Sequence, residues 1–145
     1  MPETLRLQLV SPERLLVDEQ VTEVQVPALD GYIGVLPGHA PLLSELKPGG
    51  VLTYVAGGQP KALAVYGGFV EVLGNSVRVL ADSAEFATEI DKGKARQNLQ
   101  AAMKRMENPT VEPPAGEAAD PAVALADMMR AQAAVEAAAL TTNHG

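Results

Sequence analysis

Apolar residues change their spacing near Thr88, and this change limits the fold more than any other feature of the 145-residue chain. Before it, apolar and polar residues alternate over short stretches such as 5–9, which is typical of half-buried strands. After it, apolar residues recur at every third or fourth position, which is typical of helices that pack through one face. We therefore expect a β domain over residues 1–88 and a helical C-terminal domain over residues 89–145.

Short apolar runs in the first domain are separated by turns, with no helical segment between them. Glycine-containing turns at 57–60 and 74–75 each divide two runs, which predicts two β-hairpins. The run 51–55 is apolar on both faces, so we expect it inside a sheet and not at an edge. Together these features predict an all-β sandwich or barrel.

Two helices are expected after the β domain, with a linker between them. Thr88 and Asp91 have the spacing of a capping box, so the first helix should span about 89–106. Three prolines and a glycine break any helix over 107–120, which makes this segment a linker. Asp120 and Pro121 have the residue types of an N-cap and a first helical position, so we expect the second helix to span about 121–140.

Alanine dominates the second predicted helix. Nine of the eighteen residues 122–139 are alanine. Alanine favours the helical conformation but buries little apolar area, so intrinsic propensity is high and tertiary anchorage is weak. We expect this helix to be lightly docked, and to move or fray.

The charge lies in blocks. The net charge is −7, but residues 90–106 hold five basic residues and one acid. These basic residues are Lys92, Lys94, Arg96, Lys104 and Arg105. They form either a solvated helix face, which is the commoner case, or a helix that docks on an acidic surface. The overall acidity argues against a nucleic-acid partner.

Composition excludes several classes of protein. The chain has no cysteine, so disulfides, thiolate metal sites and cysteine nucleophiles are excluded. No run approaches the ~18 apolar residues that a membrane span needs. The first ten residues alternate and do not have the pattern of a signal peptide. We expect a soluble intracellular protein with no membrane span of its own.

Side chains suited to catalysis are scarce. The two histidines are His39 and His144, and His144 lies in a tail that resembles a disordered end, so a transition-metal site is not expected. Residues 92–95 superficially resemble a phosphate loop but lack its leading glycine and its Ser/Thr. The carboxylates are scattered and do not pair. We therefore expect a protein that is not an enzyme and has no cofactor or metal.

One stretch, residues 27–43, interleaves three glycines and three prolines with large apolar residues. As a structural element it is a pair of tight turns whose glycines adopt positive φ. As a contact surface it is also plausible, because Leu29, Tyr32 and Leu36 are too apolar for a purely solvated loop. Composition alone leaves both interpretations open.

The run 31–43, GYIGVLPGHAPLL, resembles the signature of the epsilon subunit of bacterial F-type ATP synthases, called delta in mitochondria. Shorter pieces are similar to the same family in the same order: VSPE at 10–13, KPG at 47–49, GGFVEV at 67–72 and NSVRVLADSAE at 75–85. The resemblance covers about residues 5–91 and extends to the helical tail in layout. It implies an N-terminal β-sandwich followed by a two-helix C-terminal part.

The resemblance also implies a function. The chain would be a non-catalytic rotor subunit in the central stalk of a proton- or sodium-driven synthase. Its sandwich would bind the gamma subunit and the ring of membrane c subunits. Its helices would reach the alpha and beta subunits and inhibit ATP hydrolysis. Through these partners it would be peripheral on the cytoplasmic face of the cell's inner membrane.

Two sets of residues follow from the resemblance. The family's loop that faces the c ring and gamma corresponds here to Asp30, Gly31, Tyr32 and His39. The family's nucleotide motif, Ile/Leu-Asp-x-x-Arg-Ala, corresponds to residues 90–95, where Asp91 matches and Lys94 replaces the arginine. Because lysine lacks the bidentate fork that arginine offers to phosphate, we expect ATP to be at most a weak regulatory ligand.

The inhibitory tail would use basic residues of both helices. These are Lys92, Arg96, Lys104, Arg105 and Arg130. Since Arg130 is the only basic residue of the second helix, we expect modest inhibition that depends mainly on the first helix. The alternative is a free-standing β-sandwich that binds a small ligand, with the helices as a lid. The signature run favours the rotor subunit, which would co-purify with membranes through its partners.

Overall fold

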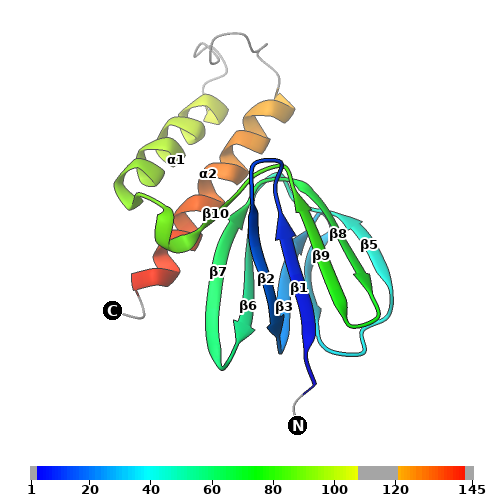
Figure 1. Cartoon of the computed structure of the whole chain (residues 1–145). Coiled ribbons are helices and arrows are strands. Elements are labelled where there is room, and N and C mark those ends of the chain that lie inside the picture. The colour runs from blue at the N-terminus through cyan, green and yellow to red at the C-terminus, as the bar shows by residue number, and fades with distance from the viewer. Residues whose placement is uncertain (1–2, 108–120, 143–145) are drawn as a thin grey trace.

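The computed structural model describes residues 3–107 and 121–142, which form two five-stranded sheets followed by a pair of helices (Figure 1). The strands are β1 (Leu5–Val10), β2 (Leu15–Val21), β3 (Glu23–Ala28), β4 (Gly31–Val35), β5 (Leu42–Glu45), β6 (Gly50–Ala56), β7 (Gln59–Val65), β8 (Gly68–Leu73), β9 (Ser76–Ala81) and β10 (Ala84–Phe86). The predicted sandwich with a two-helix C-terminal part is confirmed. Glu107, the first residue of the predicted linker 107–120, is the last residue of the first helix, and the rest of that linker and His144 lie outside the described residues.

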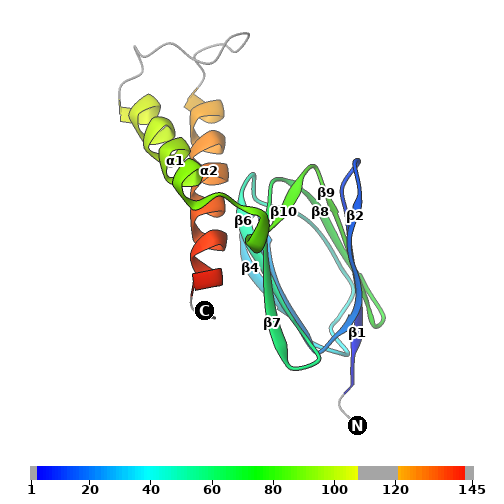
Figure 2. The same ribbon diagram turned by 60° about the vertical axis from the view of Figure 1, so that its left-hand side comes forward.

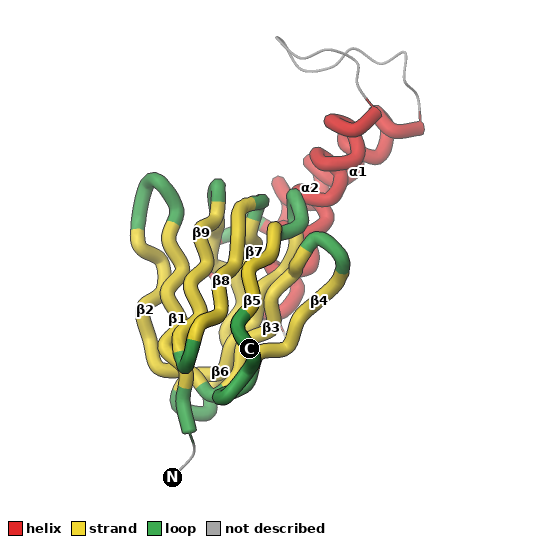
Figure 3. Tube along the Cα trace, turned by 90° about the vertical axis from the view of Figure 1, so that its right-hand side faces the viewer, coloured by secondary structure: helices red, strands yellow, loops and turns green. Residues whose placement is uncertain are grey.

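The two sheets face each other. Sheet A has the strand order β2-β1-β9-β8-β5, and sheet B has the order β10-β7-β6-β3-β4 (Figure 3). Neighbouring strands are antiparallel except β1 and β9, which run parallel. The two predicted hairpins are β6–β7 and β8–β9. As predicted for a strand that is apolar on both faces, β6 lies inside its sheet, between β7 and β3.

An aliphatic core fills the space between the sheets. Leu5, Leu7 and Leu9 of β1 are fully buried, while the alternate residues of the strand face outward. The buried residue Tyr54 is the largest side chain in this core. Its hydroxyl donates to Glu19 at 3.1 Å. Burial, together with this carboxylate, raises the pKa of Tyr54, so the phenol stays protonated.

The first helix begins later than its predicted capping box indicated. Thr88 lies in a short 3-10 helix, η1 (Ala87–Glu89), and α1 spans Lys92–Glu107. The carboxylate of Asp91 accepts the backbone N–H of Lys94 at 3.0 Å, so Asp91 is the N-cap. The prediction that Thr88 starts the helix was therefore wrong by about one turn.

A long-range contact explains the shift. The guanidinium of Arg14, in the loop between β1 and β2, donates to both carboxylate oxygens of Glu89, at 2.8 and 3.3 Å. The same carboxylate accepts the backbone N–H of Phe86. These contacts hold residues 86–89 against the sandwich, and the backbone at Ile90 is extended before α1 begins.

The second helix, α2 (Pro121–Thr142), lies between α1 and sheet B (Figure 2). Its Ala133, Ala137 and Ala138 are almost completely buried. Ala137 packs in one cluster with Val51 of β6 and Ala64 of β7. The small alanine side chains let the helix backbone approach the sheet closely. Neither described helix is long and apolar enough to cross a bilayer.

Candidate functional site

The stretch 27–43 folds partly as strand. It contains the end of β3, a two-residue turn at Leu29 and Asp30, strand β4, and a loop that leads into β5. Gly31 starts β4 with φ 143° and Gly38 lies in the following loop with φ 86°, so two of the three glycines have the positive φ expected of them. The remaining glycine, at position 34, does not.

Tyr32 lies on β4, close to the part of sheet B against which α2 packs. Its side chain is 51% exposed. The backbone N–H of Val51, on β6, donates to the Tyr32 hydroxyl at 3.2 Å. The ammonium of Lys47 lies 5.0 Å from the centre of the Tyr32 ring, within range of a cation–π interaction. Tyr32 therefore has its own structural contacts and presents only part of its ring to solvent.

His39 lies at the other end of β4. Its loop is fixed by a hydrogen bond from the Gly38 N–H to the side chain of Asn75, in the turn between β8 and β9. Its imidazole Nδ1 is 2.7 Å from the carbonyl oxygen of Ala40. The five residues of β4 separate Gly31 from this loop by about 16 Å at the usual rise of ~3.3 Å per residue. Asp30, Gly31 and Tyr32 thus form one patch, and His39 forms another.

The outer face of sheet A carries apolar side chains that the sequence analysis did not identify. Phe69 pairs with Leu80, Leu80 with Val10, and Val10 with Leu15, so these residues form one row across four strands. We call these four residues the apolar row. The side chains of Leu15, Leu80 and Phe69 are 49–57% exposed. The signal was present in runs 69–73 and 77–80, where Phe69, Leu73 and Leu80 occupy outward-facing positions beside Glu71 and Arg78.

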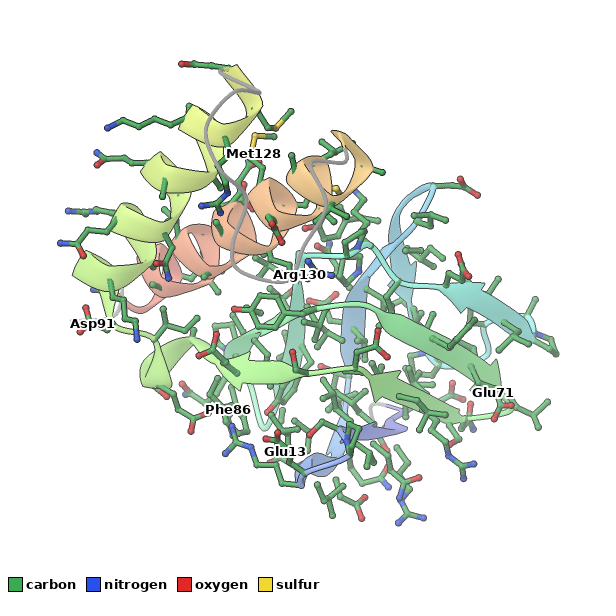
Figure 4. All side chains as sticks on the ribbon, turned by 90° about the horizontal axis from the view of Figure 1, so that it is seen from above. Glu13, Glu71, Phe86, Asp91, Met128 and Arg130 are labelled. Carbon is green, nitrogen blue, oxygen red and sulfur yellow. The ribbon has the colours of Figure 1, made fainter. Side chains whose placement is uncertain are left out.

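The predicted nucleotide residues lie at the start of α1. Asp91 caps α1, and Lys94 is exposed in the first turn. A cavity of about 450 Å³ lies elsewhere, between the sandwich edge and the two helices. Its lining contains Tyr66, Ser83, Glu85, Asn98, Ala101, Ala102, Arg105, Asp127, Arg130, Ala131 and Ala134. Figure 4 shows Asp91 at the start of α1, well apart from Arg130 on α2.

The cavity contains charges of both signs. Arg130 is paired with Asp127 of its own helix at 3.1 Å. The hydroxyl of Tyr66 donates to Glu85, and burial raises the pKa of this tyrosine. The Nε of Arg105 is buried and has no hydrogen-bond partner among the described residues. Two of the five predicted tail residues, Arg105 and Arg130, therefore line this cavity, whereas Arg96 and Lys104 are exposed on α1 and Lys92 is half-buried at its start.

No group of three or more metal-ligating side chains comes together within residues 3–107 and 121–142.

Comparison with known proteins identifies the family. Residues 4–87 match the family described as the β-sandwich domain of the ATP synthase delta/epsilon chain. The ATP synthase epsilon chain of Solibacter usitatus is 54% identical over 133 residues, which are 92% of this chain and 94% of the relative. The chain belongs to the ATP synthase delta/epsilon family. The epsilon chain of Rhodospirillum rubrum is 44% identical over 90% of this chain and 97% of its own length.

Solved structures share the fold of this epsilon-family chain. A chain of the mitochondrial ATP synthase of Euglena gracilis superposes with a TM-score of 0.76 at 24% identity, covering 96% of this chain and 83% of that one. A chain in the central stalk and c-ring structure of the Tetrahymena thermophila mitochondrial enzyme gives 0.58 at 13% identity, with 97% of both chains covered. At these identities the likeness concerns the fold alone.

Proposed function

We propose that this chain is a non-catalytic rotor subunit of the central stalk, which couples the gamma subunit to the c ring of a proton- or sodium-driven ATP synthase. The observation that carries the proposal is the 54% identity to an ATP synthase epsilon chain over nearly the whole of both sequences. The chain would be held at the cytoplasmic face of the membrane through these partners.

The apolar row is the surface that best fits the gamma subunit. It lies on sheet A, whereas the helices cover sheet B. Leu80 and Phe69 each leave about half of their side chain in water. Covering the exposed half of such a side chain contributes about 1 kcal/mol, so two of them together give a sizeable part of a specific interface. The predicted patches at Asp30–Tyr32 and at His39 lie at the two ends of the sandwich, away from the apolar row.

Binding to the gamma subunit tests this proposal. Phe69→Ser and Leu80→Ser should each weaken binding about fivefold in a titration with purified gamma, because each removes apolar area from the interface. Arg78→Ser is the matched control, since Arg78 lies on the same outer face beside the row. Thermal melts of all three variants check that the sandwich stays folded. Unchanged gamma affinity in both row variants would contradict the assignment of this surface.

The predicted ring and gamma contacts can be tested in the same preparation. Tyr32→Ala and His39→Ala should weaken attachment to the c ring in a pull-down. Tyr32→Phe is the control, because it keeps the ring near Lys47 and loses the hydroxyl that Val51 contacts. Wild-type attachment by both alanine variants would assign the two patches to structure alone.

We further propose that the helices inhibit ATP hydrolysis modestly, by leaving the sandwich and contacting the alpha and beta subunits. Lys94, Arg96 and Lys104 are exposed and available on α1, while Arg130 is already paired with Asp127. A synthase assembled with a chain ending at Thr88 should hydrolyse ATP faster than a synthase assembled with the full chain, and a synthase with a chain ending at Met106 should be intermediate. Equal rates of ATP hydrolysis with all three chain lengths would contradict an inhibitory role of the helices.

A further inference from the structure

The turn that precedes β6 contains a glycine whose backbone conformation does not require glycine. Gly49 has a φ outside the left-handed region, so other residues could adopt the same conformation. Its amino-acid identity must therefore have another physical reason. That reason lies in what the missing side chain would touch.

Helix α2 occupies the space where a side chain at position 49 would begin. A Cβ on Gly49 would lie 2.5 Å from both the backbone nitrogen and the Cα of Arg130, and closer still to the carbonyl oxygen of Met129. A methyl group cannot approach other heavy atoms so closely. Because these are backbone atoms inside a helix, no side-chain rotation relieves the clash, and α2 itself would have to move.

The rest of the contact between α2 and sheet B also depends on small side chains. Ala137 is fully buried against Val51, Ala64 and Ala87. The side-chain hydrogen bonds of Arg130 to Asp127 and of Gln132 to Glu136 stay within α2. Close fit of the backbone and methyl groups therefore makes a large contribution to the docking of α2, and this fit tolerates little extra volume.

We propose that Gly49 controls the docking of the helical pair: any side chain at this position releases α2, and α1 with it, while the sandwich stays folded. Helix α1 follows because it packs on α2. The property belongs to the isolated chain. It therefore holds or fails independently of the proposed role in the synthase.

Hydrogen exchange measured by mass spectrometry on the full-length chain tests the proposal. Gly49→Ala should speed exchange of α1 and α2 amides roughly tenfold or more, and Gly49→Val further, with β1 and β9 amides unchanged. Gly34→Ala is the matched control, because Gly34 lies in β4 of sheet B, has no positive φ, and its added Cβ would meet nothing within 4 Å.

Three outcomes would overturn the proposal. Unchanged exchange of α2 in both Gly49 variants would mean that the helix accommodates the added volume. Loss of protection in β1 and β9 would mean that the sandwich itself needs glycine at this position. An equal effect of Gly34→Ala would mean that the helices respond to any such change in sheet B.

Discussion

Two acidic residues at the domain junction have different structural roles. Glu89 points back to the sandwich, where Arg14 and the Phe86 N–H bind its carboxylate. Asp91 points forward and caps α1 through the Lys94 N–H. Side-chain hydrogen bonds therefore hold the chain on both sides of Ile90, at Glu89 and at Asp91. Ile90 is the single residue between them, and its backbone is extended. A movement of the helices as a body requires rotation at this position.

The Arg14–Glu89 pair makes the junction sensitive to acid. The hydrogen bonds from Arg14 and from the Phe86 N–H lower the pKa of Glu89 below its ordinary value. A lowered pKa in the folded state means that the pair stabilises the fold above the ordinary carboxyl pKa of about 4.3, and that this stabilisation is lost as the pH falls through the lowered value. The effect is modest, because both side chains are more than 40% exposed.

Comparison of wild type with Glu89→Gln measures this effect. At neutral pH the variant should unfold at lower temperature, since glutamine keeps the shape but loses the charge. The difference between the two proteins should shrink as the pH falls below the ordinary carboxyl pKa of about 4.3 and through the lowered pKa of Glu89, where the wild-type side chain becomes neutral as well. A difference that stays constant from pH 7 to pH 3 would show that the charge of Glu89 does not contribute.

At the scale of elements, the strands were predictable because apolar and polar residues alternate in the short runs, and this alternation indicates which face of each strand is buried. Leu5, Leu7 and Leu9 are an example, and they are buried as expected. The start of α1 was not predictable, because Arg14 engages Glu89 across 75 positions of sequence. The apolar row was missed for a similar reason. Its members come from four strands, and only the register between those strands brings them together.

The pairing of charges in the cavity between the sandwich and the helices bears on nucleotide binding. Arg130 is paired with Asp127, Glu85 lies in the same cavity, and Asp91 and Lys94 are outside it. Calorimetry with the isolated chain should therefore detect ATP binding only weaker than about 100 μM, or none. Asp127→Asn should strengthen binding, because it removes one carboxylate and leaves Arg130 free to pair with phosphate. Micromolar affinity that Asp91→Ala abolishes would contradict this expectation.

At the scale of the whole molecule, the sandwich and the helices differ in what stabilises them. The main core lies between the two sheets, and its buried members run from Leu5 to Ala81. The helical pair rests on the outer face of sheet B through a small cluster around Ala137. The sandwich therefore contains its own core, whereas the helices depend on the sandwich for theirs.

A chain that ends at Thr88 tests this division. It keeps all ten strands and the whole main core, so it should unfold in one cooperative thermal transition with a β-type circular dichroism spectrum. It should be less stable than the full chain by about 1–3 kcal/mol, because Val51 and Ala64 lose their cover. A spectrum of an unfolded chain at 25 °C would show that the helices are needed for the sandwich to fold.

The parallel pairing of β1 with β9 has a consequence for how the chain is made. Strand β1 lies between β2 and β9, so one of its two edges stays unpaired until β9 is available. During synthesis, residues 76–81 leave the ribosome after most of the sandwich has already emerged. Sheet A therefore cannot form completely until β9 has emerged. Until then the leucines of β1 lack their contacts with β9. Nascent chains shorter than about 80 exposed residues should bind chaperones, and release should coincide with the emergence of β9.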